Sequence, residues 1–268
     1  DSKNHYLTER LPDAEGIPAL YLTWREHLRS LGKLKMNAES FVLDVGCSNG
    51  QFLNFMEIRY KIHGVGVDIS IQALTAASKR NPRQHFLLHS AERKFPFGDA
   101  SFDYITCLDV IEHIEKPDGT IRELYRILKP GGKILFHIPV SDNGGSMDWF
   151  CRKYMPKLWK QKIEAAGHNY EVILTRKGYE AALSEAGFEI LFSHRYNSFL
   201  QCIFDHHMMH RILNRAFYVW GLPFSFYHRL VAPLIEAAFS LDRVLQWIDI
   251  GGSIYIGVTK PPLKHFQV

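Results

Sequence analysis

The sequence predicts an α/β fold, with a doubly wound parallel sheet that has helices on both faces. Short apolar runs alternate with helix-period stretches along the first half of the chain, and a glycine-rich turn joins the first run to the first helix. Hydrophobic residues make up 46% and charged residues 22% of the 268 residues, as in an ordinary globular protein. Ligands of such sheets bind at the carboxyl ends of the strands, so the residues that follow each strand are the candidates for a site.

The predicted elements alternate regularly up to residue 138. A helix pattern at residues 19–31 comes first. The strand candidates are residues 41–45, an apolar run ending at Asp68, and residues 86–88, 104–107 and 133–138. Helix patterns at residues 51–60, 71–79 and 120–128 separate them, the last closed by Pro130, Gly131 and Gly132. Strands and helices in this order predict βαβ units.

The second half of the chain is less regular. It contains a loop and helix at residues 144–167, a helix at 177–186, a strand at 188–192 and a strand at 252–259. Between the last two strands lies a long aromatic stretch with a helical pattern. We therefore predict one domain over residues 1–268, with an N-terminal helical segment (1–40), a core (41–196 and 252–268) and a helical insertion (197–251).

Composition excludes several classes of protein. The formal net charge is only +4 and no target-reading module is recognisable, so we expect no nucleic acid partner. The four cysteines lie far apart, which is typical of free thiols in a reducing compartment. No signal-peptide pattern is visible, and the longest charge-free apolar run, residues 216–227, is interrupted by Gly221 and Pro223 and is too short to span a bilayer. These features predict a cytoplasmic location.

The turn at residues 44–50 is the strongest local signal. Gly46 and Gly50 allow the backbone to approach a ligand closely, and the following helix presents free N–H groups to it. Asp68, 22 positions after Gly46, lies where a carboxylate meets ribose hydroxyls in nucleotide-binding folds. A nicotinamide dinucleotide site needs G-x-G-x-x-G, and Ser48 and Gln51 replace two of its glycines. The turn therefore disfavours a nicotinamide-dependent oxidoreductase.

Five motifs in order resemble those of class I S-adenosylmethionine-dependent methyltransferases. They are residues 44–50, 64–70, 95–104, 109–114 and 128–132. The likeness is closest to the branch that modifies small molecules and lipids, such as the quinone-biosynthesis type. The resemblance implies a Rossmann-like methyltransferase fold with a seven-stranded, mostly parallel sheet whose last strand is antiparallel. It also implies S-adenosyl-L-methionine as cofactor and S-adenosyl-L-homocysteine as product.

The resemblance also implies roles for individual residues. Asp44, Gly46 and Gly50, with Cys47 and Ser48 in the same loop, would contact the methionine part of the cofactor. Asp68 would hold the ribose, Ile69 would lie against the adenine, Ala91 would offer its backbone to the adenine edge, and Asp109 would lie beside the transferable methyl. Two positions depart from the family pattern. Ser48 replaces the usual middle glycine, and Ser90 stands where an acidic residue often binds the adenine amino group.

His113 and Asp109 are the predicted catalytic residues. A histidine titrates near neutrality and suits the removal of a proton from an acceptor. The alternatives are that His113 bonds to the sheet edge and that Asp109 caps a helix. His137 would point into the substrate cavity or into the helix layer, and His168 and Tyr170 would close over the site or form a capping turn.

No metal site is predicted. His206, His207 and His210 lie beside Asp205, and two of these histidines are one helical turn apart. No further ligand follows at a suitable spacing, so surface or interface packing explains this cluster better.

The second half of the chain contains two segments that indicate the chemical class of the methyl acceptor. Residues 147–163 mix lysine and arginine with tryptophan and tyrosine, which fits a membrane surface or an acidic substrate, or else a solvated charged face. The apolar faces around Phe217, Trp220, Phe224 and Phe226 must be buried on the core, in a homodimer, around a substrate or on lipid. Both segments are predicted to cap the substrate entrance. The sequence thus predicts a methyltransferase acting on a small-molecule or lipid-like acceptor, with peripheral membrane contact and a homodimer both open. The alternative is a catalytically silent S-adenosylmethionine-binding protein of the same fold.

Overall fold

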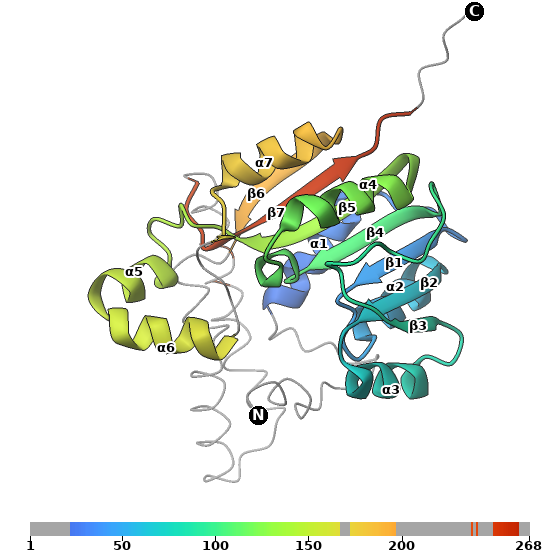
Figure 1. Cartoon of the computed structure of the whole chain (residues 1–268), viewed down its shortest axis with the longest axis horizontal. Coiled ribbons are helices and arrows are strands. Elements are labelled where there is room, and N and C mark those ends of the chain that lie inside the picture. The colour runs from blue at the N-terminus through green and yellow to red at the C-terminus, as the bar shows by residue number, and fades with distance from the viewer. Residues whose placement is uncertain (1–21, 167–171, 197–236, 238–239, 241–248, 263–268) are drawn as a thin grey trace, which may run out of the picture.

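A seven-stranded sheet forms the centre of the molecule (Figure 1), with strand order β3-β2-β1-β4-β5-β7-β6. This computed structural model describes residues 22–166, 172–196, 237, 240 and 249–262. The strands are β1 Phe41–Val45, β2 His63–Asp68, β3 His85–Leu88, β4 Phe102–Leu108, β5 Leu128–Pro139, β6 Glu189–Tyr196 and β7 Ser253–Thr259. Strands β1 to β5 pair in parallel, and β7 runs antiparallel to both β5 and β6. The predicted fold class is confirmed, including the reversed last strand.

Helices pack on both faces of the sheet (Figure 1). The packed helices are α1 Leu22–Lys33, α2 Gln51–Tyr60, α3 Ile71–Arg80, α4 Pro117–Ile127 and α7 Arg176–Glu185, and two further helices are α5 Met147–Tyr154 and α6 Pro156–Ala166. One core cluster joins α4 and α7 to the sheet through residues such as Leu124 and Leu183. The other joins α1 and α2 through Leu31 and Leu53. Each such buried side chain favours folding by about 1.5–3 kcal/mol, so both faces of the sheet contribute to the core.

The start of β5 differs from the prediction. Pro130, Gly131 and Gly132 do not separate helix from strand, because α4 ends at Ile127 and β5 begins at Leu128. The backbone N–H of Gly131 donates to the Lys260 carbonyl at 2.7 Å, and the Lys260 N–H donates to the Gly132 carbonyl at 3.0 Å. These bonds to the chain beyond β7 hold the Pro-Gly-Gly segment in the sheet as an irregularity in the β4–β5 register.

Helix α1 is fixed to the far edge of the sheet. Glu26, fully buried on α1, accepts a hydrogen bond from His194 Nε2 on β6 at 2.8 Å. The next residue, His27, is also buried, and its Nδ1 lies 2.7 Å from the Tyr255 hydroxyl on β7. Helix α1 therefore brings His27 to the same region as the ends of β4 and β5.

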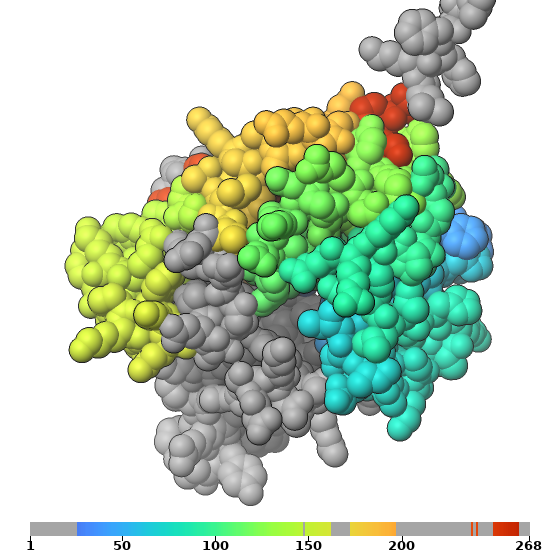
Figure 2. All heavy atoms as spheres, in the orientation of Figure 1, coloured from blue at the N-terminus to red at the C-terminus, as the bar shows by residue number. Residues whose placement is uncertain are grey.

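Helices α5 and α6 form a hairpin that projects at one end of the molecule (Figures 1 and 2). Within the described parts of the chain, no helix is both long and apolar enough to cross a bilayer. Most of the predicted insertion at 197–251, including Phe217, Trp220, Phe224 and Phe226, lies outside the described residues. His168, Tyr170 and the cluster of Asp205, His206, His207 and His210 lie outside them too.

Candidate active site

The loop between β1 and α2 bends sharply through three residues in the left-handed region. The φ angles are +73° at Gly46, +48° at Ser48 and +71° at Gly50. A Cβ at Gly46 would run into Val110 Cγ2, and one at Gly50 would lie 2.8 Å from Asn81 Nδ2. Both the backbone conformation and the space therefore require glycine at these two positions. The predicted close approach of backbone to ligand has its structural basis here.

Ser48 adopts the conformation for which the family uses glycine. A left-handed residue with a side chain costs about 1–2 kcal/mol. The backbone N–H of Ser48 donates to Asp68 Oδ2 at 2.9 Å, and this charge-assisted bond offsets the cost. Serine can therefore replace the usual glycine at position 48, because its N–H bonds the loop to Asp68 at the end of β2.

Asp68 stands at the carboxyl end of β2, and two backbone groups orient its side chain. Ser48 N–H donates to Oδ2, and Ser70 N–H donates to Oδ1 at 2.8 Å. The side chain is partly exposed, and each carboxylate oxygen can accept a further hydrogen bond. The carboxylate is therefore held ready to accept bonds from two hydroxyls.

Asp44, at the end of β1, is buried and accepts a hydrogen bond from the Thr106 hydroxyl at 2.6 Å. Burial raises the pKa of this carboxyl to about 7, with a further contribution from the charge of Asp68, while the Thr106 bond acts in the opposite direction. In the cofactor-free protein Asp44 is therefore largely protonated below neutral pH.

The cofactor-free protein should lose stability relative to an Asp44→Asn variant as pH rises from about 4 to 7. The folded-state pKa lies above the ordinary 3.8, so the folded protein holds the Asp44 proton more tightly than the unfolded chain does. The stabilisation present below pH 4 is lost as pH rises through 7, by at most about 1.4 kcal/mol per pH unit. Urea unfolding of both proteins from pH 4 to 8 measures this difference. A constant difference across the range would contradict it.

The remaining predicted cofactor residues lie around the same loop. Ile69 follows Asp68 and is 71% exposed, which leaves an apolar surface for a planar ring. Ala91 is half-buried, and its carbonyl accepts a hydrogen bond from Thr120 Oγ1 at 2.8 Å. Cys47 is buried, and burial raises the pKa of its thiol well above the ordinary range. The thiol is therefore unreactive.

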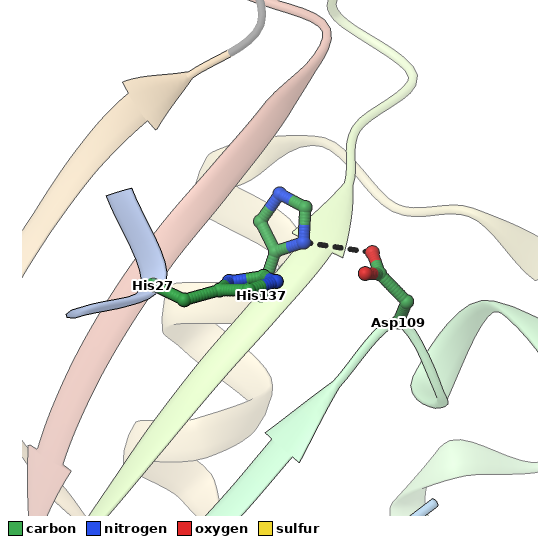
Figure 3. A group of neighbouring side chains, drawn as sticks. All are labelled: His27, Asp109 and His137. Carbon is green, nitrogen blue, oxygen red and sulfur yellow. Dashed lines mark ion pairs between the residues drawn. The ribbon is translucent and has the colours of Figure 1, made fainter. Parts of the chain in front are cut away.

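Asp109 lies at the carboxyl end of β4 in a strained conformation, with φ at +55°. It does not cap a helix, because Val110 occupies the N-cap position of the short helical turn η2 Ile111–His113. The Asp109 N–H donates to the His137 carbonyl at 3.1 Å, and Asp109 Oδ1 lies 2.7 Å from His137 Nδ1 (Figure 3). The capping interpretation is wrong, and Asp109 pairs with β5 instead.

His113 and Glu112 follow in the same turn and have opposite environments. Glu112 is buried, and burial together with the Asp109 charge raises its pKa well above the usual range. Glu112 is thus a neutral acid near neutral pH. His113 is exposed.

His137 points into a polar cluster that the sequence did not predict. It is buried beside Asp109, and its Nε2 lies 2.8 Å from Ser253 Oγ on β7. The His27 ring lies with its centroid 5.4 Å from that of His137. His27, Ser253 and Tyr255 carried no local signal, because they come from segments at the two ends of the chain.

The comparisons with known proteins agree with this geometry. A family model described as a methyltransferase domain matches residues 43–136, which run from within β1 to within β5 and include every predicted cofactor-binding and catalytic residue. Residues 43–136 belong to the class I S-adenosylmethionine-dependent methyltransferase family. The match confirms the predicted methyltransferase class, and S-adenosyl-L-methionine is the cofactor of that class.

Named relatives of this methyltransferase act on different acceptors. It is 28% identical over 180 residues to "Phosphoethanolamine N-methyltransferase 1" of Arabidopsis thaliana, an alignment that covers 64% of this chain and 33% of that protein. It is 30% identical over 142 residues to "Ubiquinone biosynthesis O-methyltransferase" of Albidiferax ferrireducens, covering 48% of this chain and 54% of that protein. The chain therefore spans about one third to one half of the length of these relatives.

A solved structure shares the fold. Phosphoethanolamine N-methyltransferase 2 of Haemonchus contortus, in complex with S-adenosyl-L-methionine, superposes with a TM-score of 0.59 at 21% identity. The superposition covers 89% of this chain and 53% of that one. At this identity the likeness concerns the fold alone.

Proposed function

We propose that this methyltransferase transfers a methyl group to an oxygen or nitrogen atom of a small-molecule or lipid-like acceptor. One observation carries the proposal. The loop at residues 46–50, Asp68 and Asp109 all follow parallel strands and meet at the carboxyl edge of β1, β2 and β4. This edge is where ligands of such sheets bind, and it brings the predicted cofactor residues together with the predicted catalytic residues.

The protein's own residues have three tasks in this proposal. The cofactor supplies a methyl group already activated by a sulfonium. The loop and Asp68 orient that group, and the strand-end residues align the acceptor in line with it. Asp109 carries the charge beside the reacting atoms, and His113, exposed one turn further on, takes the acceptor's proton.

The named relatives support an acceptor that must lose a proton. Their names specify N-methylation of phosphoethanolamine and O-methylation in ubiquinone biosynthesis. A hydroxyl or protonated amine is a poor nucleophile until the proton leaves, which gives a base at this edge a role.

A methyl-transfer assay tests the proposal. Labelled S-adenosyl-L-methionine is incubated with the full chain and with acceptor panels of amines, catechols, polyprenyl phenols and extracted lipids. The expected result is label in one acceptor class, dependent on His113. Binding of S-adenosylhomocysteine without label in any panel would favour the catalytically silent alternative.

The α5–α6 hairpin supports an acceptor at a membrane surface. Tyr154 is 58% exposed and Leu158 57%, and both lie among the exposed Lys153, Lys157 and Lys160. Apolar side chains surrounded by lysines fit an interface with anionic lipid. Figure 2 shows this hairpin at the periphery of the molecule, where it can meet a surface.

The full chain should sediment with anionic liposomes at low salt and less so at physiological salt. Each lysine near such a surface contributes about 1 kcal/mol, so Lys153→Gln with Lys157→Gln should weaken binding by about tenfold or more. A matched control is Lys79→Gln with Arg80→Gln at the end of α3. Protein that stays in the supernatant at both salts would contradict the membrane proposal. A dimer seen by light scattering would then favour the homodimer interface.

A further inference from the structure

Three metal-ligating side chains from distant parts of the chain meet at the carboxyl ends of β4 and β5 (Figure 3). His27 comes from α1, Asp109 follows β4 and His137 lies on β5, and one ligand atom of each lies within 4.8 Å of the others. Two imidazoles with one carboxylate form the ligand set of many catalytic metal sites, which keep coordination positions open.

Each imidazole is oriented through its other nitrogen. The Tyr255 hydroxyl lies 2.7 Å from His27 Nδ1, and the Ser253 hydroxyl lies 2.8 Å from His137 Nε2. Both hydroxyls come from β7, and Tyr255 is the register partner of His137. Histidines that bind metals usually have their second nitrogen hydrogen-bonded in this way, which fixes the tautomer. The arrangement directs His27 Nε2 and His137 Nδ1 toward the cluster.

Burial and charge suit a cation at this place. Both imidazoles are buried, at 8% and 6% exposure, whereas the Asp109 side chain is 51% exposed. His27 lies buried between the Tyr255 hydroxyl and His137, so its ring is held in place at the cluster. The carboxylate supplies negative charge on the side open to solvent.

The backbone conformation at Asp109 sets the direction of its carboxylate. A non-glycine residue at φ +55° is strained by about 1–3 kcal/mol, and such strain persists where the surroundings enforce it. Here the bond from the Asp109 N–H to the His137 carbonyl enforces it, and the carboxylate turns toward the His137 ring.

We propose that His27, Asp109 and His137 bind a divalent first-row transition cation, with Zn²⁺ the best match. Magnesium and calcium prefer oxygen ligands, so two imidazoles select against them. The role of the ion rests on the proposed function: an open position beside Asp109 would bind an acceptor oxygen and ease the loss of its proton. No local sequence pattern predicts this site, because no two of its ligands are close in the chain.

Calorimetry of the chelator-treated full chain with Zn²⁺ tests the proposal, with Co²⁺ absorption as a spectroscopic probe. We expect one equivalent bound through this site, with no competition from Mg²⁺. Removing the hydroxyl with Tyr255→Phe should weaken that binding by about 10–100-fold, as for other outer partners of metal ligands. His137→Gln removes a ligand and should weaken it further.

Two controls separate this site from other histidines. His63→Gln removes an exposed histidine of β2, and His206→Ala with His210→Ala removes the pair that is four apart in the sequence. Both should leave the Co²⁺ spectrum unchanged. Circular dichroism establishes that each variant folds, and Tyr255→Phe keeps the ring that packs against His137. Zn²⁺ binding equal in wild type, Tyr255→Phe and His137→Gln would overturn the proposal.

The same samples distinguish this inference from the proposed function. Methyl transfer by a chain that binds no Zn²⁺ would overturn the metal site and leave the transferase intact. Zn²⁺ binding that depends on His137, in a chain that labels no acceptor, would support the metal site and contradict the proposed function.

Discussion

Replacing His113 with glutamine is expected to lower turnover by about 10²–10⁴ and to leave the affinity for S-adenosylhomocysteine unchanged. Glutamine keeps a polar side chain of similar size but removes the group that takes a proton. His113 is exposed at the end of the turn Ile111–His113 and belongs to no predicted cofactor contact. Steady-state kinetics of the labelled-methyl assay and calorimetry measure the two quantities separately.

A matched substitution tests whether the effect belongs to this position. His85→Gln changes another exposed histidine, at the start of β3, and should leave turnover unchanged. Thermal unfolding of each variant supplies the structural readout. If His113→Gln loses stability and activity in parallel, His113 supports the sheet edge and is not the base.

The parts of this protein that the sequence predicts well are those encoded in short segments. The conformation of the turn at residues 44–50 follows from its own residues, since glycine at 46 and 50 permits a left-handed backbone that other residues disfavour. Asp68 is predictable for a similar reason, because it ends a strand and parallel strands bring their carboxyl ends to one edge. The alternation of strands and helices along the chain then predicts that the strands pair in parallel.

Features that depend on contacts between distant segments were not predictable. The Asp109 pairing with His137 follows from the β4–β5 register, and the place of His27 follows from how α1 packs against β5 and β7. Neither appears in any local pattern, so the capping interpretation of Asp109 was reasonable and wrong. The inclusion of Pro130–Gly132 in β5 was not predictable for the same reason, because the hydrogen-bond partner of this segment, Lys260, lies beyond the last strand.

Asp68→Ala is expected to weaken S-adenosylhomocysteine binding at least tenfold. Two charge-assisted hydrogen bonds to ribose hydroxyls would contribute about 1.5–3 kcal/mol each, and the loss of one alone is about a factor of ten. The carboxylate is oriented for this contact by the Ser48 and Ser70 N–H groups. Calorimetry of the folded variant measures the dissociation constant, with Asp118→Ala, an exposed acid in the first turn of α4, as the control. An unchanged constant would contradict the predicted ribose contact.

The Asp68 carboxylate also closes the loop at Ser48, so its removal could act on the loop and not on the ribose. A cofactor analogue that lacks the ribose 2′-hydroxyl separates the two causes through a double-mutant cycle. If Asp68 contacts the ribose directly, the analogue binds wild type less tightly than S-adenosylhomocysteine does, and Asp68→Ala no longer distinguishes the two ligands. If Asp68 acts only through the loop, the variant weakens both ligands equally and the preference for the hydroxyl remains. The coupling between residue and hydroxyl, rather than the loss of affinity alone, therefore decides the role of Asp68.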